Sequence, residues 1–418
     1  MNTFSLIFIS ALGLHWVVQL WLDRRQIRRI LAHRDRVPPA FETFIPLAAH
    51  QKAADYNVAR IRFGMIESTI GVLLLLAWTL GGGLNLLDQF WRGWLHSPLA
   101  LGVAFLLSAF LLMALLDLPA SIYRTFVIEQ RFGFNRTTPV TFIGDMLKSA
   151  ILLLILGGPF AAGVLWLMQL AGAWWWLKVW ALWMGFNLLM QWAYPAIIAP
   201  LFNRFSPLAD LGLVQRIEAL LRRTGFTSDG VFVMDGSKRS SHGNAYFTGF
   251  GRHKRIVFFD TLLKELAPEE IEAVLAHELG HFRRRHVIKR LLLMAALSLA
   301  GLAILGWLIV QPWFYAGVGI SQSSAHAALM IFLLISPHFT FLLQPLGAWM
   351  SRRHEFEADD YAIEQSDGRA LVRALVKLYR ENANTLTPDP LYSAYHDSHP
   401  PAPLRVAYLQ RRLNPSTA

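Results

Sequence analysis

The stretch Ala273-Val-Leu-Ala-His277-Glu278-Leu-Gly-His281-Phe282 carries the pattern His-Glu-x-x-His in a segment with helical character. Residues four apart lie one turn apart on the same face of an α-helix, so both imidazoles can reach one zinc ion. Glu278 then lies beside the position that a catalytic zinc leaves open. Pro268 suits the first turn of such a helix, and the arginines from Arg283 onward suit its last turn. Taken alone, the five-residue pattern is also compatible with a charged amphipathic helix that binds no metal.

The composition indicates a membrane protein. Of the 418 residues, 54% are hydrophobic and only 16% are charged, and the mean hydropathy is +0.38. Soluble domains average about 25% charged residues. Cysteine is absent, which excludes disulfides and cysteine ligands. A zinc site in this chain must therefore use histidine and carboxylate, the donors typical of catalytic sites.

Seven apolar segments are long enough to cross a bilayer as helices. They centre on residues 4–22, 61–84, 99–122, 146–168, 174–198, 288–311 and 325–349. The first segment has no basic region before it and is followed by arginines rather than by a cleavage site. We therefore interpret it as a retained membrane helix and not as a signal peptide.

The basic residues predict how the chain is oriented. The net charge is +11, but the basic residues mostly flank apolar segments, which favours membrane retention over nucleic-acid binding. Connections 23–60 and 123–145 are rich in arginine, whereas 169–173 and 312–324 have neither lysine nor arginine. By the positive-inside rule the N-terminus lies outside and the long polar segments are cytoplasmic. In a bacterium the membrane would be the inner (plasma) membrane.

The predicted fold is mainly α, with four parts along the chain. These are membrane helices one to five (1–198), a cytoplasmic α+β region that ends in the His-Glu-x-x-His helix (199–287), membrane helices six and seven (288–349), and a cytoplasmic C-terminal region (350–418). In the α+β region an amphipathic helix is expected near 210–224. Strands are expected at 231–234, 244–250 and 256–259, with a hairpin connection at Gly251–Lys254.

Two histidines are not enough for a catalytic zinc, which needs a third protein ligand. A metzincin motif would require glycine and histidine where the chain has Arg284 and Val287, so that class is excluded. The remaining candidates are His286, His354 and Glu355. His286 lies five positions after His281, which turns it away from the face that the ligand histidines share.

Topology favours Glu355 as the third ligand. Membrane segments six and seven have a short connection and should form an antiparallel helical hairpin. His281 lies just before segment six and Glu355 just after segment seven, so both are expected at the same depth. Asp359 lies one turn after Glu355, where its carboxylate can accept the second N–H of a ligand histidine. A solvated acidic helix face is the alternative for these carboxylates.

Five polar residues within or at the ends of apolar segments need a separate explanation. They are Glu67, Asp117, Asp145, Lys148 and Asn187. Such side chains cannot face lipid cheaply. A water-filled internal chamber and charge pairing within a tight helix bundle explain them equally well.

Several motifs, in order along nearly the whole chain, resemble those of a known family. They are Tyr123-Arg-Thr-Phe-Val-Ile-Glu-Gln-Arg-Phe-Gly-Phe-Asn135, Pro200-Leu-Phe-Asn-Arg-Phe205, Gly236-Ser-Lys-Arg-Ser-Ser-His-Gly-Asn-Ala-Tyr-Phe247, the His-Glu-x-x-His helix, Arg353-His-Glu-Phe-Glu-Ala-Asp359 and Ser398-His-Pro-Pro401. Together they resemble the type I CAAX prenyl proteases, integral-membrane zinc metallopeptidases of the gluzincin clan. The resemblance implies a fold of seven helices around a large intramembrane chamber.

The resemblance also implies roles for individual residues. It implies one zinc ion per chain, with His277, His281 and Glu355 as ligands. Glu278 would be the general base, Asp359 the second carboxylate of the Glu-x-x-x-Asp motif, and His399 a stabiliser of the oxyanion. The resemblance further implies that Asn244 and Ala245 lie on a strand that pairs with the substrate backbone, and that Arg405 lies near the zinc. Without it, Asn244 would be interpreted as a turn residue and His399 as a surface histidine.

Three functional hypotheses follow from the sequence. The first is a monomeric zinc endopeptidase of the membrane that acts on peptides or proteins, either prenylated CAAX C-termini or damaged membrane proteins, and contacts lipid. The second is a metal or solute transporter, which the absence of an internal sequence repeat disfavours. The third is a catalytically inactive membrane scaffold. Glu278 argues against a scaffold, because binding a metal alone requires no base.

Overall fold

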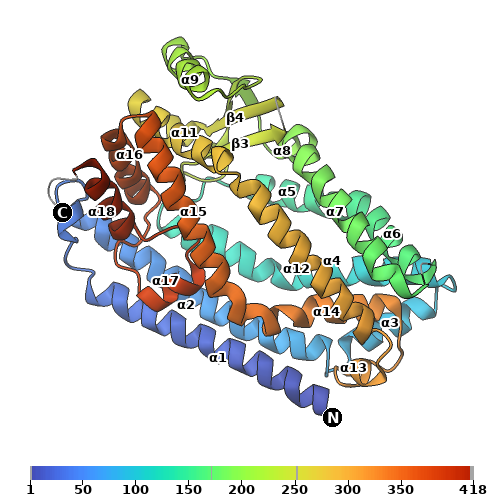
Figure 1. Cartoon of the computed structure of the whole chain (residues 1–418). Coiled ribbons are helices and arrows are strands. Elements are labelled where there is room, and N and C mark those ends of the chain that lie inside the picture. Colours follow the sequence, from blue (N-terminus) through green and yellow to red (C-terminus); the bar gives the residue numbers. More distant parts are fainter. Residues whose placement is uncertain (1, 171, 251–252, 415–418) are drawn as a thin grey trace.

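The computed structural model describes residues 2–170, 172–250 and 253–414. The first half of the chain is almost entirely helical (Figure 1). Its helices are α1 (Thr3–Ala32), α2 (Leu47–Trp78), α3 (Gly83–Arg92), α4 (Pro98–Tyr123) with its π-helical continuation η2 (Arg124–Glu129), α5 (Pro139–Leu152), α6 (Gly158–Leu170), α7 (Trp175–Ala193) and α8 (Ala199–Phe202).

Six helical stretches within the described residues are long and apolar enough to cross a membrane. They are Thr3–Ala32, Leu47–Trp78, Pro98–Glu129, Pro139–Leu170, His286–Leu308 and Ala325–Gln365. The seventh predicted segment, 174–198, is also helical, as α7 and the π-helix η5 (Tyr194–Ile198). Several of these helices are longer than the predicted apolar segments, because polar turns extend them beyond the part that can lie in the hydrocarbon core.

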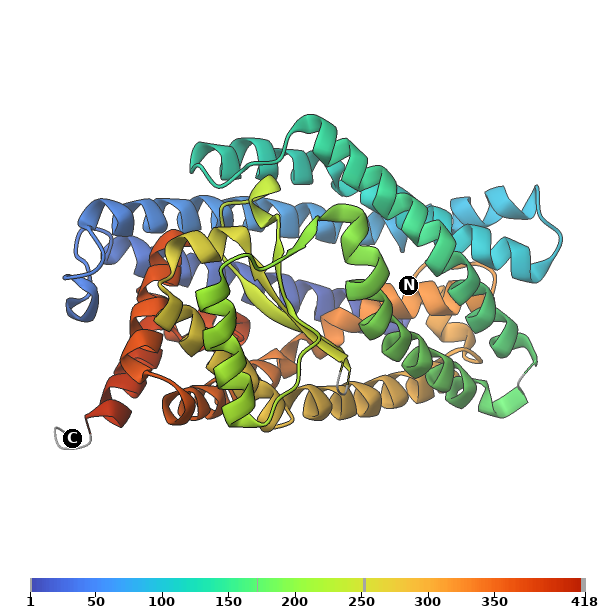
Figure 2. The ribbon, with the colours of Figure 1, turned by 90° about the horizontal axis from the view of Figure 1, so that it is seen from above.

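The membrane helices form a ring (Figures 1 and 2). Helix α1 packs against α2 and against α14 (Ala325–Thr340), and α14 packs against α12 (His286–Leu308). Helix α12 packs against α7, α7 against α6, and α6 against α4. Contacts of α14 with α4 and α6 close one end of the ring. An apolar core fills that end, where Phe8, Phe105 and the Phe314 side chain of α13 (Pro312–Ala316) are fully buried.

A polar cavity of about 740 Å³ lies towards the other end of the ring. Residues of α1, α2, η2 and the C-terminal region line it, among them Gln19, Asp23 and Asn57. Glu67 and Arg124 also line the cavity and form an ion pair. Glu67 therefore fits both explanations, because it lines an internal polar cavity and also pairs with Arg124. Asp145 is explained by pairing, since Arg239 donates to it from Nε at 2.7 Å.

A small mixed sheet stands outside the membrane helices. Its strands are β1 (Phe205–Pro207), β2 (Val231–Met234), β3 (Ala245–Phe250) and β4 (His253–Phe259), in the order β1-β2-β4-β3. β1 pairs antiparallel with β2, β2 parallel with β4, and β3 antiparallel with β4. The three predicted strands are present, and β1 was not predicted. The predicted hairpin connection Gly251–Lys254 lies partly outside the described residues.

Helices that pack on the sheet complete the polar region. α9 (Leu211–Thr224) begins where Asp210 accepts a hydrogen bond from the Leu213 amide, and it ends before Gly225, whose φ is 70°. α10 (Asp260–Glu265) and α11 (Pro268–Arg283) follow the sheet. Their apolar faces share one core with α9, β4 and α16 (Gly368–Glu381), which includes Ile217, Phe258 and Leu371.

The C-terminal region continues directly from the last membrane helix. Through the short turn η7 (Phe341–Leu343), α14 leads into α15 (Gln344–Gln365), which rises towards α11 (Figure 1). α16, α17 (Pro390–His396) and α18 (Ala402–Leu413) then pack around α15. Glu355, the third predicted ligand, thus lies on α15, which extends a membrane helix. It packs beside α11, which carries His277 and His281.

Candidate metal centre

Local sequence accounts for helix α11. Pro268 occupies its first turn, where the missing N–H costs no helical hydrogen bond. Glu270 accepts a hydrogen bond from the Ala267 amide at 2.8 Å and so caps the helix start. The same carboxylate accepts from Lys377 Nζ at 2.8 Å, which ties α11 to α16. The apolar face of α11 is buried, so the His-Glu-x-x-His turns are held on a rigid element.

Helices α11 and α15 approach each other closely at the centre of the site. A Cβ atom added to Gly280 would lie 2.9 Å from Ala358 Cα and 3.0 Å from the Ala358 carbonyl oxygen. Only glycine fits at this crossing. The glycine between the two histidines therefore has a packing role, because it lets the backbone of α15 come within reach of the imidazoles.

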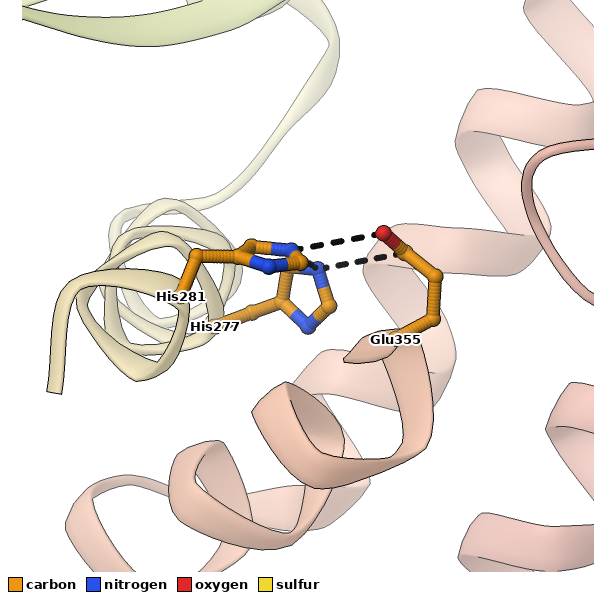
Figure 3. A group of neighbouring side chains, drawn as sticks. All are labelled: His277, His281 and Glu355. Atoms are coloured by element: carbon orange, nitrogen blue, oxygen red, sulfur yellow. Dashed lines mark hydrogen bonds and ion pairs between the residues drawn. The ribbon is translucent and has the colours of Figure 1, made fainter. Parts of the chain in front are cut away.

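His277, His281 and Glu355 converge from these two helices (Figure 3). Their potential ligand atoms all lie within 4.8 Å of one another. Glu355 Oε1 is 3.3 Å from His281 Nε2, Glu355 Oε2 is 3.4 Å from His277 Nε2, and the two Nε2 atoms are 3.2 Å apart. Such a two-histidine, one-carboxylate group is the ligand set of a catalytic zinc site that keeps an open position.

The donor atoms fit a bound cation. Glu355 Oε2 is buried and has no hydrogen-bond partner among the described residues. His277 Nδ1 lies 2.8 Å from Asp359 Oδ1 and can donate to it, which leaves the lone pair of Nε2 directed at the group. Burial lowers the pKa of His277, but the carboxylates of Asp359 and Glu355 outweigh burial and raise this pKa to about 9. The surroundings of His277 therefore favour positive charge, as a metal site requires.

Arg405 and Asp359 form a buried ion pair behind His277. Arg405 donates from Nε at 2.8 Å and from Nη2 at 2.7 Å to the two carboxylate oxygens of Asp359. Asp359 is fully buried and Arg405 is 5% exposed. Arg405 Nη1 also lies 3.4 Å from Glu355 Oε2. The arginine thus holds in place the carboxylate that orients His277, and it compensates part of the negative charge of the site.

A cavity of about 280 Å³ brings most of the predicted site residues together. It is lined by residues that the sequence placed on four different segments: Asn244, Ala245, His277, Glu278, Glu355, His399 and Arg405. The side chain of His399 is 65% exposed, and its Nε2 atom lies 3.6 Å from Glu355 Oε1. His281 and Asp359 do not line this cavity but contact the residues that do. The cavity therefore brings the Glu278 carboxylate, two members of the candidate metal group and the start of strand β3 together.

His286, which was weighed as a third ligand, lies behind His281 instead. The Nδ1 atoms of the two rings are 2.9 Å apart, and one of them donates to the other. His286 Nε2 is 3.0 Å from Glu357 Oε2, and the His354 ring stacks on His286 with centroids 4.0 Å apart. A carboxylate–histidine chain of this kind fixes the orientation of a ligand histidine. The sequence did not predict that His286 would orient His281. Its spacing did show that His286 does not share the helix face of His277 and His281.

The fold and this site define an integral-membrane metallopeptidase. Residues 26–204 match the family model described as CAAX prenyl protease N-terminal, five membrane helices, and residues 207–413 match that of peptidase family M48. The chain therefore belongs to the CAAX prenyl protease family within peptidase family M48. Membership implies a metal-dependent enzyme that acts on peptides or proteins, and it does not favour the transporter and scaffold hypotheses.

Individual relatives extend over almost the whole chain. A CAAX prenyl protease 1 homolog of Arabidopsis thaliana is 35% identical over 406 residues, which cover 92% of each protein. CAAX prenyl protease 1 of Saccharomyces cerevisiae is 32% identical over 93% of this chain and 91% of its own. The crystal structure of S. mikatae Ste24p superposes with a TM-score of 0.91, at 30% identity, over 98% of this chain and 99% of that one.

The close crossing of α11 and α15 predicts the effect of one added methyl group. Replacing Gly280 with alanine is expected to push the two helices apart, because its Cβ would meet backbone atoms of Ala358 that cannot rotate away. Overpacking of this kind costs about 1–3 kcal/mol. The metal affinity, measured by competition with a chelator, should fall at the same time. Gly347→Ala on α15 is the matched control, since nothing lies within 4 Å of its added Cβ. Equal metal affinity in the two variants would contradict the prediction.

Proposed function

We propose that the chain is a zinc endopeptidase with one zinc ion per chain, held by His277, His281 and Glu355. The observation that carries this proposal is the convergence of the three side chains from α11 and α15, with a buried carboxylate oxygen among them that accepts no hydrogen bond from the described residues. A zinc ion bound there would act as a Lewis acid on the scissile carbonyl and make water a stronger acid.

The residues of the chain supply the remaining chemistry. We assign Glu278, which lines the same cavity, as the general base that takes a proton from water and later delivers it to the leaving amine. His399 Nε2 is assigned as a donor to the oxyanion that develops on the carbonyl. Asp359 keeps the Nδ1 proton on His277, and Arg405 keeps Asp359 charged and in place.

Substrate binding is assigned to the start of strand β3. Asn244 and Ala245 line the cavity beside Glu278, and β3 is the last strand in the order β1-β2-β4-β3. A peptide in extended conformation can add to such an edge through main-chain hydrogen bonds. This would set the register of the scissile bond relative to the base.

The substrate class and the orientation are also part of the proposal. We propose that the enzyme cleaves prenylated CAAX C-termini, in keeping with the name CAAX prenyl protease that its relatives carry. Damaged membrane proteins are the alternative substrate class.

The positive-inside pattern supports a cytoplasmic site and an outer N-terminus, in the inner membrane if the source is bacterial. We further propose a monomer without a nucleic-acid partner. The division 1–198, 199–287, 288–349 and 350–418 is proposed as the domain organisation.

Metal removal tests the proposed function. We expect the purified protein to contain one zinc ion per chain by elemental analysis and to hydrolyse a farnesylated CAAX peptide. A chelator should abolish hydrolysis, and stoichiometric zinc should restore it. An unprenylated peptide of the same sequence is the control for the substrate class. Hydrolysis that survives complete removal of the metal would overturn the proposal.

A further inference from the structure

A second hollow, of about 900 Å³, lies on the opposite side of the loop that carries His399. We call it the proline groove. It is bounded by the end of α1, the segment after it, α15 and the segments before α17 and α18. Its walls are mostly apolar and include Val37, Pro38, Pro39, Trp349, Phe356, Leu386, Pro388, Pro390, Pro400, Pro401, Pro403 and Leu404.

Four arginines line the proline groove, and two of them are already engaged: Arg353 pairs with Glu357, and Arg352 donates to three backbone carbonyls. Arg29 and Arg36 line the groove, are exposed, and make no ion pair with any residue that the structure describes. Two other arginines nearby are paired: Arg25 pairs with Asp389 at 3.0 Å and Arg34 with Asp55 at 2.7 Å. The groove thus combines an apolar interior with two cations that are free to bind an anion.

The position of the groove points to a lipid. It is bounded by the polar end of α1, which continues to Ala32 beyond the apolar segment 4–22, and by Trp349, the last residue of the apolar segment 325–349. Trp349 and Leu404, on two different helices, line the groove and are 58% and 62% exposed, and exposed tryptophan is typical of the boundary between hydrocarbon and headgroups. The Thr387 hydroxyl oxygen is buried in the groove wall without a hydrogen-bond partner among the described residues.

We propose that the proline groove is a binding site for one anionic phospholipid of the adjoining leaflet. An acyl chain would lie along the proline, tryptophan and leucine side chains, and the anionic headgroup would lie between Arg29 and Arg36. A zwitterionic phospholipid would match the apolar walls equally well but would leave the two guanidinium groups uncompensated. The charge of the headgroup, rather than the chain, therefore decides which lipid binds.

The groove shares a wall with the active-site side of the molecule. Pro388, Pro400 and Pro401 line both the proline groove and the polar cavity, which His399 also lines. Pro401 directly precedes α18, the helix that carries Arg405. A lipid in the groove would therefore hold the loop and the helix that bring His399 and Arg405 to the metal centre. This consequence for catalysis rests on the proposed function, whereas lipid binding itself does not.

Fluorescence quenching in nanodiscs tests the site with the full chain. Phosphatidylglycerol or phosphatidylcholine with brominated acyl chains is titrated into phosphatidylcholine discs, and the Trp349 signal is obtained by subtracting a Trp349→Phe variant. We expect the brominated anionic lipid to quench at a much lower mole fraction than the brominated zwitterionic lipid. Arg29→Gln combined with Arg36→Gln should reduce this preference roughly 30-fold, since each arginine near an anionic lipid contributes about fivefold.

The control is the double variant Arg24→Gln and Arg28→Gln. It removes the same amount of charge from the same end of α1 that carries Arg29, but neither residue lines the groove, so the preference should persist. Equal quenching by both lipids in the unmodified protein, or an equal loss of preference in the control, would overturn the proposal. A protein that shows selective quenching but hydrolyses no peptide in any lipid would retain the lipid site and refute the proposed function instead.

Discussion

Replacing Glu278 with glutamine is expected to lower kcat by about 10²–10⁴-fold, which is the usual contribution of a general base. The substitution keeps the size and shape of the side chain, but it replaces one carboxylate oxygen with an NH₂ group and so removes the ability to accept a proton. Glu278 is not among the three residues that form the metal group, so the metal content should remain unchanged. Hydrolysis of a farnesylated peptide and elemental analysis of the same preparation measure the two quantities.

The control for this substitution lies on the same helix. Glu269 is an exposed residue in the first turn of α11 and pairs with Arg216 at 2.9 Å on the surface. Glu269→Gln makes the same chemical change far from the cavity and should leave kcat within about twofold, as surface substitutions have small effects. If Glu278→Gln hydrolysed peptides at the unmodified rate, the assignment of the base would be wrong.

Replacing Arg405 with alanine is expected to have the largest effect on stability. The substitution leaves Asp359 fully buried without its bidentate partner, and breaking a buried pair in this way costs about 3–5 kcal/mol. His277 would lose the fixed carboxylate that orients it, so metal affinity should fall as well. Thermal unfolding in detergent and chelator competition report the two effects separately.

Arg412 provides the comparison on the same helix. It donates to Asp360 at 2.9 Å, and its side chain is 55% exposed against 6% for Arg405. Exposed pairs contribute about 0–1 kcal/mol, so Arg412→Ala should shift the unfolding temperature little. Similar shifts for the two variants would show that burial of the Arg405–Asp359 pair has no special role.

The sequence predicted most of the helices and the metal group because these depend on local or simple long-range rules. Apolar length predicts membrane helices, and the four-residue spacing of His277 and His281 places them on one face. Glu355 followed from the antiparallel arrangement of the last two membrane segments. The roles proposed for Asn244, Ala245, His399 and Arg405 required the family resemblance. No local sequence pattern shows that segments 244–245 and 399–405 line the same cavity as the metal group.

Other features could not be predicted, because they depend on tertiary packing. The hydrogen-bonded chain from His281 through His286 to Glu357 joins three helices, α11, α12 and α15, whose mutual rotation no periodicity specifies. Strand β1 has three residues, too few for an alternating pattern to stand out. The proline groove is formed by segments from both ends of the chain, and its prolines appear in the sequence only as turn residues.

The outer position of β3 has a consequence for selectivity. A neighbour added to an edge strand is recognised by amide and carbonyl groups that every peptide possesses, irrespective of its side chains. If the substrate adds to β3 as proposed, we expect the enzyme to discriminate poorly between amino-acid sequences at the scissile bond. Selection must then depend on what delivers a chain to the membrane and on whether that chain is unfolded enough to extend beside β3.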